Sequence, residues 1–183
     1  LIYGLGQKGN LHDTIYTHWR YCHDLPQGEV VYGLDFGFNN PSAMTKVVFH
    51  EGGIYVDEVI YETKLTTNDL VEKVKSLGIS QYDEIFCDSA EPKTIEELCR
   101  CGLNAKPSNK DVTEGIKKIK SVPMYVTEKS HNLVKELRNY KWKTDRNGNK
   151  LDQPVKFNDH ISDAMRYAIF SKLTIPSVTW GAI

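Results

Sequence analysis

The chain has 183 residues, 40% hydrophobic and 26% charged, which is enough for one well-buried domain and too little for two. No apolar run is long enough to cross a bilayer and no charged segment leads into an apolar one, so we expect a soluble protein that is neither membrane-bound nor secreted. The formal net charge of −1 argues against a strongly basic nucleic-acid-binding protein.

Residues 1–28 mix polar and aromatic side chains without a regular period. We therefore predict an irregular lead-in or linker that packs on the domain. Because the first residue is Leu1 rather than Met, we also expect that the chain is part of a longer protein.

Three segments rich in Val, Ile, Tyr and Phe follow, at residues 29–36, 43–50 and 53–62, and each is predicted to be a strand. The turns between them, NNPS and EGG, are short. Short turns join neighbouring strands in opposite directions, so we expect an antiparallel meander.

The pattern then changes to alternating helices and strands. A helix with apolar residues on one face ends at Gly78, a strand covers 83–88, and a second helix covers 92–102 with Pro92 in its first turn. A short strand near 103–108, a helix through Val112, Ile116 and Ile119, and a strand over 122–127 continue this alternation. Such units extend a sheet with parallel strands and place helices on its faces.

A helix over 131–140, a β-hairpin over 139–154 and a helix over 159–173 complete the order. The hairpin turn contains Asn147 and Gly148, and its basic strands are expected to project from the fold. This is the order of a ribonuclease H-like α/β fold, over residues 29–173, with a mixed sheet flanked by helices and a tail over 174–183. The last helix is predicted to bury Ile161, Ala164, Met165, Ala168 and Ile169.

Asp35 lies in an apolar strand, where a carboxylate is costly to bury unless it is paired or binds a metal. Gly33 and Gly37 are predicted to leave room beside it for a substrate backbone. Two other interpretations remain open at this point. Asp35 is compatible with the start of a turn, and an Asp-x-Gly strand also opens the nucleotide-binding hairpin of actin-like and sugar-kinase ATPases.

Asp88 ends a strand and precedes a helix. Either it caps that helix, or Ser89 does so and Asp88 points off the strand end, where open α/β sheets bind ligands. Within a turn of it, Glu91 and Lys93 are candidates to contact metal-bound water or phosphate.

On the last helix, His160 and Asp163 are three residues apart and share one face. The alternative for Asp163 is a solvated carboxylate paired with Arg166. Asp159 is predicted to cap the helix.

Together Asp35, Asp88 and Asp163 supply the carboxylates that phosphodiester hydrolysis needs to hold Mg²⁺ or Mn²⁺, with two ions during catalysis. Without cations these carboxylates would repel one another. His160 is a candidate for proton transfer or for contact with a metal-bound water.

Between residues 117 and 150 there are ten Lys or Arg against three Asp or Glu, so this segment carries +7 and the rest −8. These side chains are either ordinary solvated surface or, as a set beside a metal site, a face that follows phosphates. The four cysteines lack the spacing of a zinc site, and we expect free thiols.

The motifs YGLDFGFNNPSA, FCDSAEPKTIEEL, YKWKTDRNG and DHISDAMRYA, in this order, resemble the nuclease domain of the large terminase subunit of tailed bacteriophages and prophages. The similarity extends over about residues 4–170. In that family an N-terminal ATPase motor pumps DNA into a procapsid, and a C-terminal ribonuclease H-like domain cuts concatemeric DNA. This chain has no GxxxxGK[ST] phosphate loop, so it looks like the nuclease half alone.

The resemblance implies that Asp35, Asp88 and Asp163 bind metal, that His160 is the site histidine, and that the hairpin over 141–150 lies near the active-site groove. It implies a Mg²⁺- or Mn²⁺-dependent endonuclease for double-stranded DNA with little sequence specificity, acting in the host cytoplasm. The implied partners are the missing ATPase domain, the small terminase subunit and the portal or procapsid. The expected DNA-binding residues are Lys93, Lys141, Lys143, Arg146 and Lys150.

Two rival functions are weighed against this one. An actin-like phosphotransferase needs a second nucleotide-binding half, which 183 residues hardly supply. A non-catalytic ribonuclease H-like module that only docks DNA or capsid proteins would gain nothing from three clustered acids. The net charge of −1 implies that the isolated domain binds DNA weakly.

Overall fold

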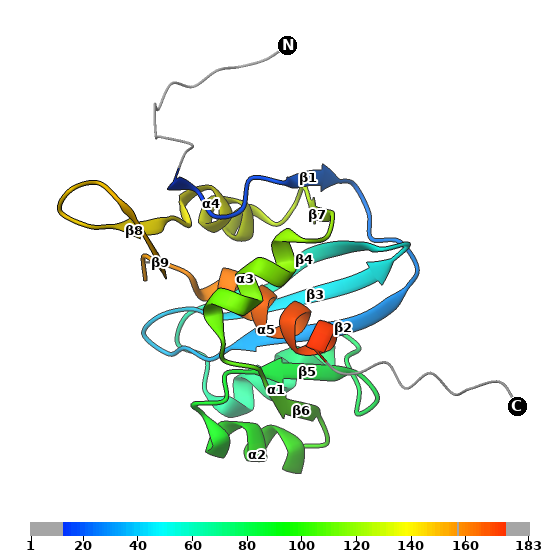
Figure 1. The fold of residues 1–183 in the computed structure, drawn as a ribbon. Helices are drawn as coiled ribbons and strands as arrows, with labels where there is room; N and C mark the ends of the chain where they lie inside the picture. Colours follow the sequence, from blue (N-terminus) through cyan, green and yellow to red (C-terminus); the bar gives the residue numbers. More distant parts are fainter. Residues whose placement is uncertain (1–12, 157, 175–183) are drawn as a thin grey trace, which may run out of the picture.

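The computed structural model describes residues 13–156 and 158–174, which form a seven-stranded sheet between two layers of helices (Figure 1). The strand order in the sheet is β1-β7-β4-β3-β2-β5-β6, and β8 and β9 form a separate hairpin. The strands are β1 Trp19–Cys22, β2 Glu29–Asp35, β3 Ser42–His50, β4 Gly53–Glu62, β5 Glu84–Cys87, β6 Asn104–Pro107, β7 Met124–Thr127, β8 Trp142–Thr144 and β9 Lys150–Pro154. The helices are α1 Thr67–Ser76, α2 Pro92–Arg100, α3 Val112–Lys120, α4 His131–Asn139 and α5 His160–Thr174.

The predicted ribonuclease H-like arrangement is confirmed. Strands β2, β3 and β4 pair antiparallel, while β5 and β6 extend the sheet in parallel beyond β2, and β7 pairs parallel with β4. The hairpin β8–β9 extends away from the body of the domain (Figure 1).

Strand β1 was not expected, because we predicted an irregular lead-in there. It pairs parallel with β7 at the edge of the sheet, with Trp19 opposite Met124. Just before it, Ile15 and Tyr16 are fully buried in the core. The sequence around β1 lacks an alternating pattern because the strand lies at an edge and is held by backbone pairing rather than by one buried face. Residues 1–12 of the predicted lead-in and 175–183 of the predicted tail lie outside the described residues.

Two hydrophobic clusters fill the space between the layers. One lies under α3, α4 and α5, and the other lies under α1 and α2 on the opposite face of the sheet. The predicted buried stripe of α5 is confirmed, because all five of its residues are fully buried. No helix in the described part of the chain is both long and apolar enough to cross a membrane.

Helix α5 lies unusually close to β2. A Cβ atom on Gly33 would lie 1.8 Å from the carbonyl oxygen of Ala164, so only glycine fits at this crossing. The prediction that Gly33 makes room for a substrate was therefore wrong, whereas the same prediction for Gly37 stays a prediction. Gly33 admits α5, and Gly37 admits the carbonyl oxygen of Pro41, 2.4 Å from a Cβ placed there. The close crossing brings the first turn of α5 to the end of β2.

Candidate metal centre and nucleic-acid groove

Asp35 and Asp88 lie at adjacent strand ends. Strands β2 and β5 are parallel neighbours with Leu34 opposite Cys87, so the next residue on each strand leaves the sheet at the same edge. Asp35 ends β2 and Asp88 follows β5. The first turn of α5 adds His160 and Asp163 from the side.

These four residues line one hollow of about 390 Å³, which we call the carboxylate hollow. The structure thus brings together the four residues that the sequence predicted for the catalytic and metal site. The complete lining is Asp35, Phe36, Gly37, Phe38, Asn39, Asn40, Asp88, Lys156, Asp159, His160, Asp163 and Tyr167.

Each carboxylate has a partner inside the protein. Nδ1 of His160 lies 3.1 Å from Oδ2 of Asp35, and Nη2 of Arg166 donates to Oδ1 of Asp163 at 2.8 Å. Asp88 accepts a hydrogen bond at 2.9 Å from the backbone N–H of Ala90. The residue that precedes α2 is Glu91, without a side-chain cap, so neither Asp88 nor Ser89 caps that helix.

The pKa values of Asp35, Asp163 and His160 are all raised, chiefly by burial for the two aspartates and by a hydrogen bond for His160. Burial raises the pKa of Asp35 to about 6; the hydrogen bond from His160 opposes this, and the charges of Asp163 and Asp88 add to it. Burial also raises the pKa of Asp163 against the ion pair with Arg166. The hydrogen bond with Asp35 in turn raises the pKa of His160. The ionised carboxylates therefore repel one another, and a cation at this place would relieve the repulsion.

The donor types fit Mg²⁺ or Mn²⁺, which prefer carboxylate oxygens. Their present arrangement is not a closed ligand set, since no three His, Cys, Asp or Glu side chains of the described residues are placed to hold an ion as they stand. Asp35 and Asp163 are instead held by His160 and Arg166. The assignment of Asp35, Asp88 and Asp163 as metal ligands stays a prediction.

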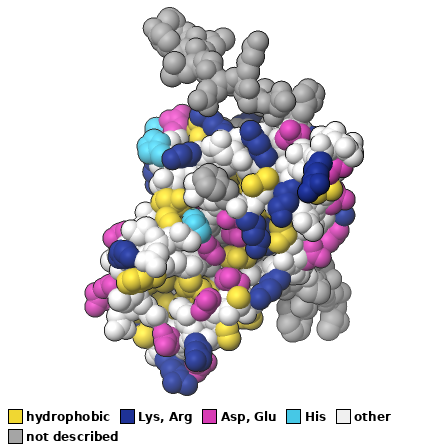
Figure 2. Space-filling view, turned by 90° about the vertical axis from the view of Figure 1, so that its left-hand side faces the viewer, with side chains coloured by type: hydrophobic (Ala, Val, Ile, Leu, Met, Phe, Trp, Pro, Cys, Tyr) yellow, Lys and Arg dark blue, Asp and Glu magenta, His cyan; other side chains and the backbone are white. Residues whose placement is uncertain are grey.

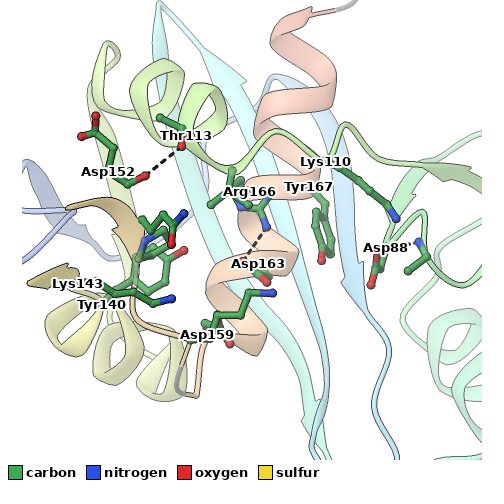
Figure 3. Close-up of a pocket in the computed structure, with 15 residues that line it drawn as sticks. Asp88, Lys110, Thr113, Tyr140, Lys143, Asp152, Asp159, Asp163, Arg166 and Tyr167 are labelled. Carbon is green, nitrogen blue, oxygen red and sulfur yellow. Dashed lines mark hydrogen bonds and ion pairs between the residues drawn. The ribbon is translucent and has the colours of Figure 1, made fainter. Parts of the chain in front are cut away.

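A second hollow of about 400 Å³ adjoins the first. We call it the basic hollow after its basic residues, although it is lined by as many acidic ones: Lys110, Lys143, Lys156 and Arg166 with Asp88, Asp152, Asp159 and Asp163. Figure 3 shows Lys110 beside Asp88 and Lys143 beside Tyr140, with Asp163 between them in this view. Both hollows share Asp88, Lys156, Asp159, Asp163 and Tyr167, so together they form one groove.

Basic side chains accompany the acidic ones along this side of the molecule. In Figure 2, Lys and Arg side chains surround a group of acidic residues and a histidine near the middle of the face. Lys110 and Lys156 are exposed residues that line the groove. Sequence reasoning missed both, since they lie in loops without a motif. It also missed Tyr167 as a lining residue.

Only one of the predicted DNA-binding residues lines either hollow. Lys143 does so, whereas Lys141 and Arg146 lie on the hairpin outside both linings. Lys150 lies 3.5 Å from Asp13 in an ion pair. Lys93 is exposed on α2 and lines neither hollow.

A seven-stranded mixed sheet with an antiparallel meander, flanking helices and acidic residues at two adjacent strand ends defines a ribonuclease H-like domain with an acidic site. More particularly, the chain belongs to the terminase ribonuclease H-like domain family, whose model matches residues 35–171.

The relatives that match in sequence are large terminase subunits. The chain is 28% identical over 164 residues to the terminase large subunit of Bacillus phage SPP1, a match that covers 81% of this chain and 38% of that protein. It is 25% identical over 146 residues to the PBSX phage terminase large subunit of Bacillus subtilis, covering 75% of this chain and 33% of that protein. The chain therefore spans between about a third and two fifths of the length of these relatives.

Solved structures share the fold. The nuclease domain of the SPP1 large terminase with bound Mn superposes with a TM-score of 0.75 at 22% identity, covering 85% of this chain and 97% of that one. The nuclease domain of the P22 large terminase gives a TM-score of 0.65 at 18% identity, covering 85% and 91%. The large terminase nuclease of thermophilic phage G20c with bound cobalt gives a TM-score of 0.61 at 15% identity, covering 86% of this chain and 97% of that one.

Proposed function

We propose that this domain is a divalent-metal-dependent endonuclease that cuts concatemeric viral double-stranded DNA during genome packaging. The observation that carries the proposal is the convergence of Asp35, Asp88, Asp163 and His160 on one hollow, in a domain of the terminase family. The manganese and cobalt bound by related nuclease domains support a divalent ion here.

The three aspartates would hold the metal ions. These ions would activate a water molecule and stabilise the leaving oxygen. Arg166 donates to Oδ1 of Asp163 and His160 lies against Oδ2 of Asp35, so each aspartate would share its carboxylate between this partner and the metal. His160 remains beside Asp35 and is placed to take or give a proton at its ring nitrogens.

The basic hollow would bind the DNA backbone beside the scissile phosphate. The side chains of Lys110 and Lys143 form no hydrogen bond or ion pair with other described residues, so their charges are available to phosphates. Lys156 lies in both linings, where its charge lowers the pKa of Asp163 against the larger effect of burial. Contacts of this kind read no bases, which agrees with low sequence specificity.

The remaining partners are proposed by analogy with related large terminases. Structures of the large terminase of another thermophilic bacteriophage were determined in complex with ADP and with ATP-gamma-S, and the matches cover only 45% and 44% of those chains. We propose that the present domain likewise acts beside an ATPase domain, and with a small terminase subunit and a portal or procapsid.

The function is tested by incubating supercoiled plasmid with the purified domain. With Mn²⁺ present, we expect nicked and then linear DNA, and EDTA should stop the reaction. A folded, monodisperse preparation that leaves the plasmid intact in Mn²⁺ would instead favour the non-catalytic docking module.

Removing the three lysine charges that line the basic hollow should weaken DNA binding. For the triple change of Lys110, Lys143 and Lys156 to Ala, we expect a higher KM for DNA. The slope of log affinity against log salt concentration should fall by about 2 to 3, since each lost phosphate contact removes about 0.9. Fluorescence anisotropy with a short DNA duplex at several salt concentrations measures the slope.

The matched control changes the same number of charges elsewhere. Lys75, Lys118 and Lys135 are exposed and line neither hollow. Their triple change to Ala should lower the slope by clearly less. Equal slopes for the two triple variants would show that the basic hollow is not part of the DNA-binding surface.

A further inference from the structure

Helix α4 carries a buried acid, Glu136, which is 5% exposed. Its neighbours on the same helix, Leu133 and Leu137, are fully buried in the core. No Lys, Arg or His of the described residues forms an ion pair with it. A carboxylate in such surroundings is costly unless other groups compensate its charge.

The compensation comes from the start of α5. Oε2 of Glu136 accepts a hydrogen bond from the backbone N–H of Ser162 at 2.9 Å, and the hydroxyl of Tyr61 on β4 donates to Oε1 at 3.1 Å. Burial raises the pKa of Glu136, and the N–H groups of Ser162 and Ile161 are the main opposing influences. These two N–H groups belong to the first turn of a helix, where no carbonyl of the same helix can accept from them.

Glu136 therefore caps α5 from a different helix. A negative charge here also interacts favourably with the helix dipole. The capped residues, Ile161 and Ser162, lie between His160 and Asp163 in the sequence. Interactions that fix this turn therefore also fix the positions of His160 and Asp163 relative to the strand ends that carry Asp35 and Asp88.

We infer that Glu136 is a positioning residue of the nuclease site, which sets the first turn of α5 so that His160 and Asp163 face the carboxylate hollow. This inference rests on the proposed function. Glu136 lines neither hollow and touches no DNA or metal in this role; it acts only through the backbone of α5.

The fold supplies a matched control. Glu58 on β4 accepts from the backbone N–H of Leu133 at 2.8 Å and from the side chain of Asn132 at 2.6 Å, so it caps α4 much as Glu136 caps α5. Helix α4 carries none of the predicted site residues. Because α4 also carries Glu136, loss of the Glu58 cap should loosen the start of this helix at Asn132 and Leu133 while the hydrogen bond from Ser162 to Glu136 remains.

The test compares Glu136→Ala, Glu136→Gln and Glu58→Ala in plasmid cleavage with saturating Mn²⁺. We expect Glu136→Ala to lower kcat by roughly ten- to a hundredfold at nearly unchanged KM, because a displacement of about 1 Å at a reacting group has this effect. Glu136→Gln should stay within about threefold of the parent, since its amide oxygen still accepts from Ser162 and its NH₂ group can donate to Tyr61. Glu58→Ala should leave kcat unchanged.

Amide hydrogen exchange of the same proteins gives a readout that does not depend on cleavage. Glu136→Ala should speed exchange at Ile161 and Ser162 while the middle of α5 keeps its protection. If the parent domain cleaves but Glu136→Ala retains its kcat, or if Glu58→Ala loses as much activity while its exchange at Ile161 and Ser162 is unchanged, the inference is wrong and the proposed function stands. If the parent does not cleave, the proposed function fails. Unchanged exchange at Ile161 and Ser162 would contradict the inference in either case.

Discussion

Asp88→Asn is expected to lower the rate of Mn²⁺-dependent DNA cleavage by on the order of a thousandfold, because a metal ion contributes several kcal/mol to the stabilisation of developing charge. The substitution removes one negative charge from the carboxylate hollow. It keeps an oxygen that can accept from the N–H of Ala90, so the turn after β5 should be preserved. Cleavage is measured as initial rates on supercoiled plasmid, with melting temperatures checked in parallel.

Asp111→Asn is the matched control for this change. Asp111 caps α3 by accepting from the N–H of Glu114 at 2.9 Å, and it lines neither hollow. The same Asp-to-Asn exchange there should leave the cleavage rate within about twofold of the parent, because no group near the reacting phosphate changes. A large loss in both variants would mean that the assay reports general damage rather than the site.

Arg166→Met is expected to destabilise the domain by about 3 kcal/mol, since breaking a buried ion pair leaves the remaining charge without compensation. Arg166 is 3% exposed, and the only hydrogen bond of its side chain within the described residues goes to Asp163. The estimate is the lower end of the usual range because the Asp163 side chain keeps 22% exposure. For a chain of this size the melting temperature should fall by roughly 6 to 12 °C.

Two comparisons sharpen this prediction. Arg100→Met breaks the exposed pair with Glu96, whose side chains are 76% and 59% exposed, and should cost less than about 0.5 kcal/mol. In Arg166→Met, saturating Mn²⁺ should restore part of the lost stability, because the ion would replace the missing positive charge beside Asp163. An equally small loss in both variants would show that the Asp163–Arg166 pair does not hold this region together.

The centre of the site followed from the sequence because two simple rules placed it. Asp88 was predicted to lie at a strand end, where open α/β sheets bind ligands, and the helical spacing placed His160 and Asp163 on one face. The pairing of β2 with β5, which brings Asp35 beside Asp88, came from the structure. The order of strands and helices likewise predicted the central sheet. Each of these inferences used contacts that regular structure imposes.

Features that depend on packing between distant segments were not predictable in this way. Gly33, two residues before Asp35, indicates that something approaches the backbone closely, but the sequence does not say whether a substrate or α5 does so. We predicted a substrate there, and this was wrong. The burial of Glu136 and Arg166 depends on how α4 and α5 pack on the sheet. Lys110 and Lys156 lie in loops, whose paths have no periodic signal.

The central claim is that Asp35, Asp88 and Asp163 share one divalent metal site. A crystal structure of the domain grown with Mn²⁺, with data collected to give the anomalous signal of manganese, tests it most directly. We predict anomalous peaks in the carboxylate hollow within bonding distance of oxygens from all three aspartates, with Asp163 turned toward the metal. Peaks located elsewhere, or an empty hollow with the Asp163–Arg166 pair intact at saturating Mn²⁺, would contradict the account.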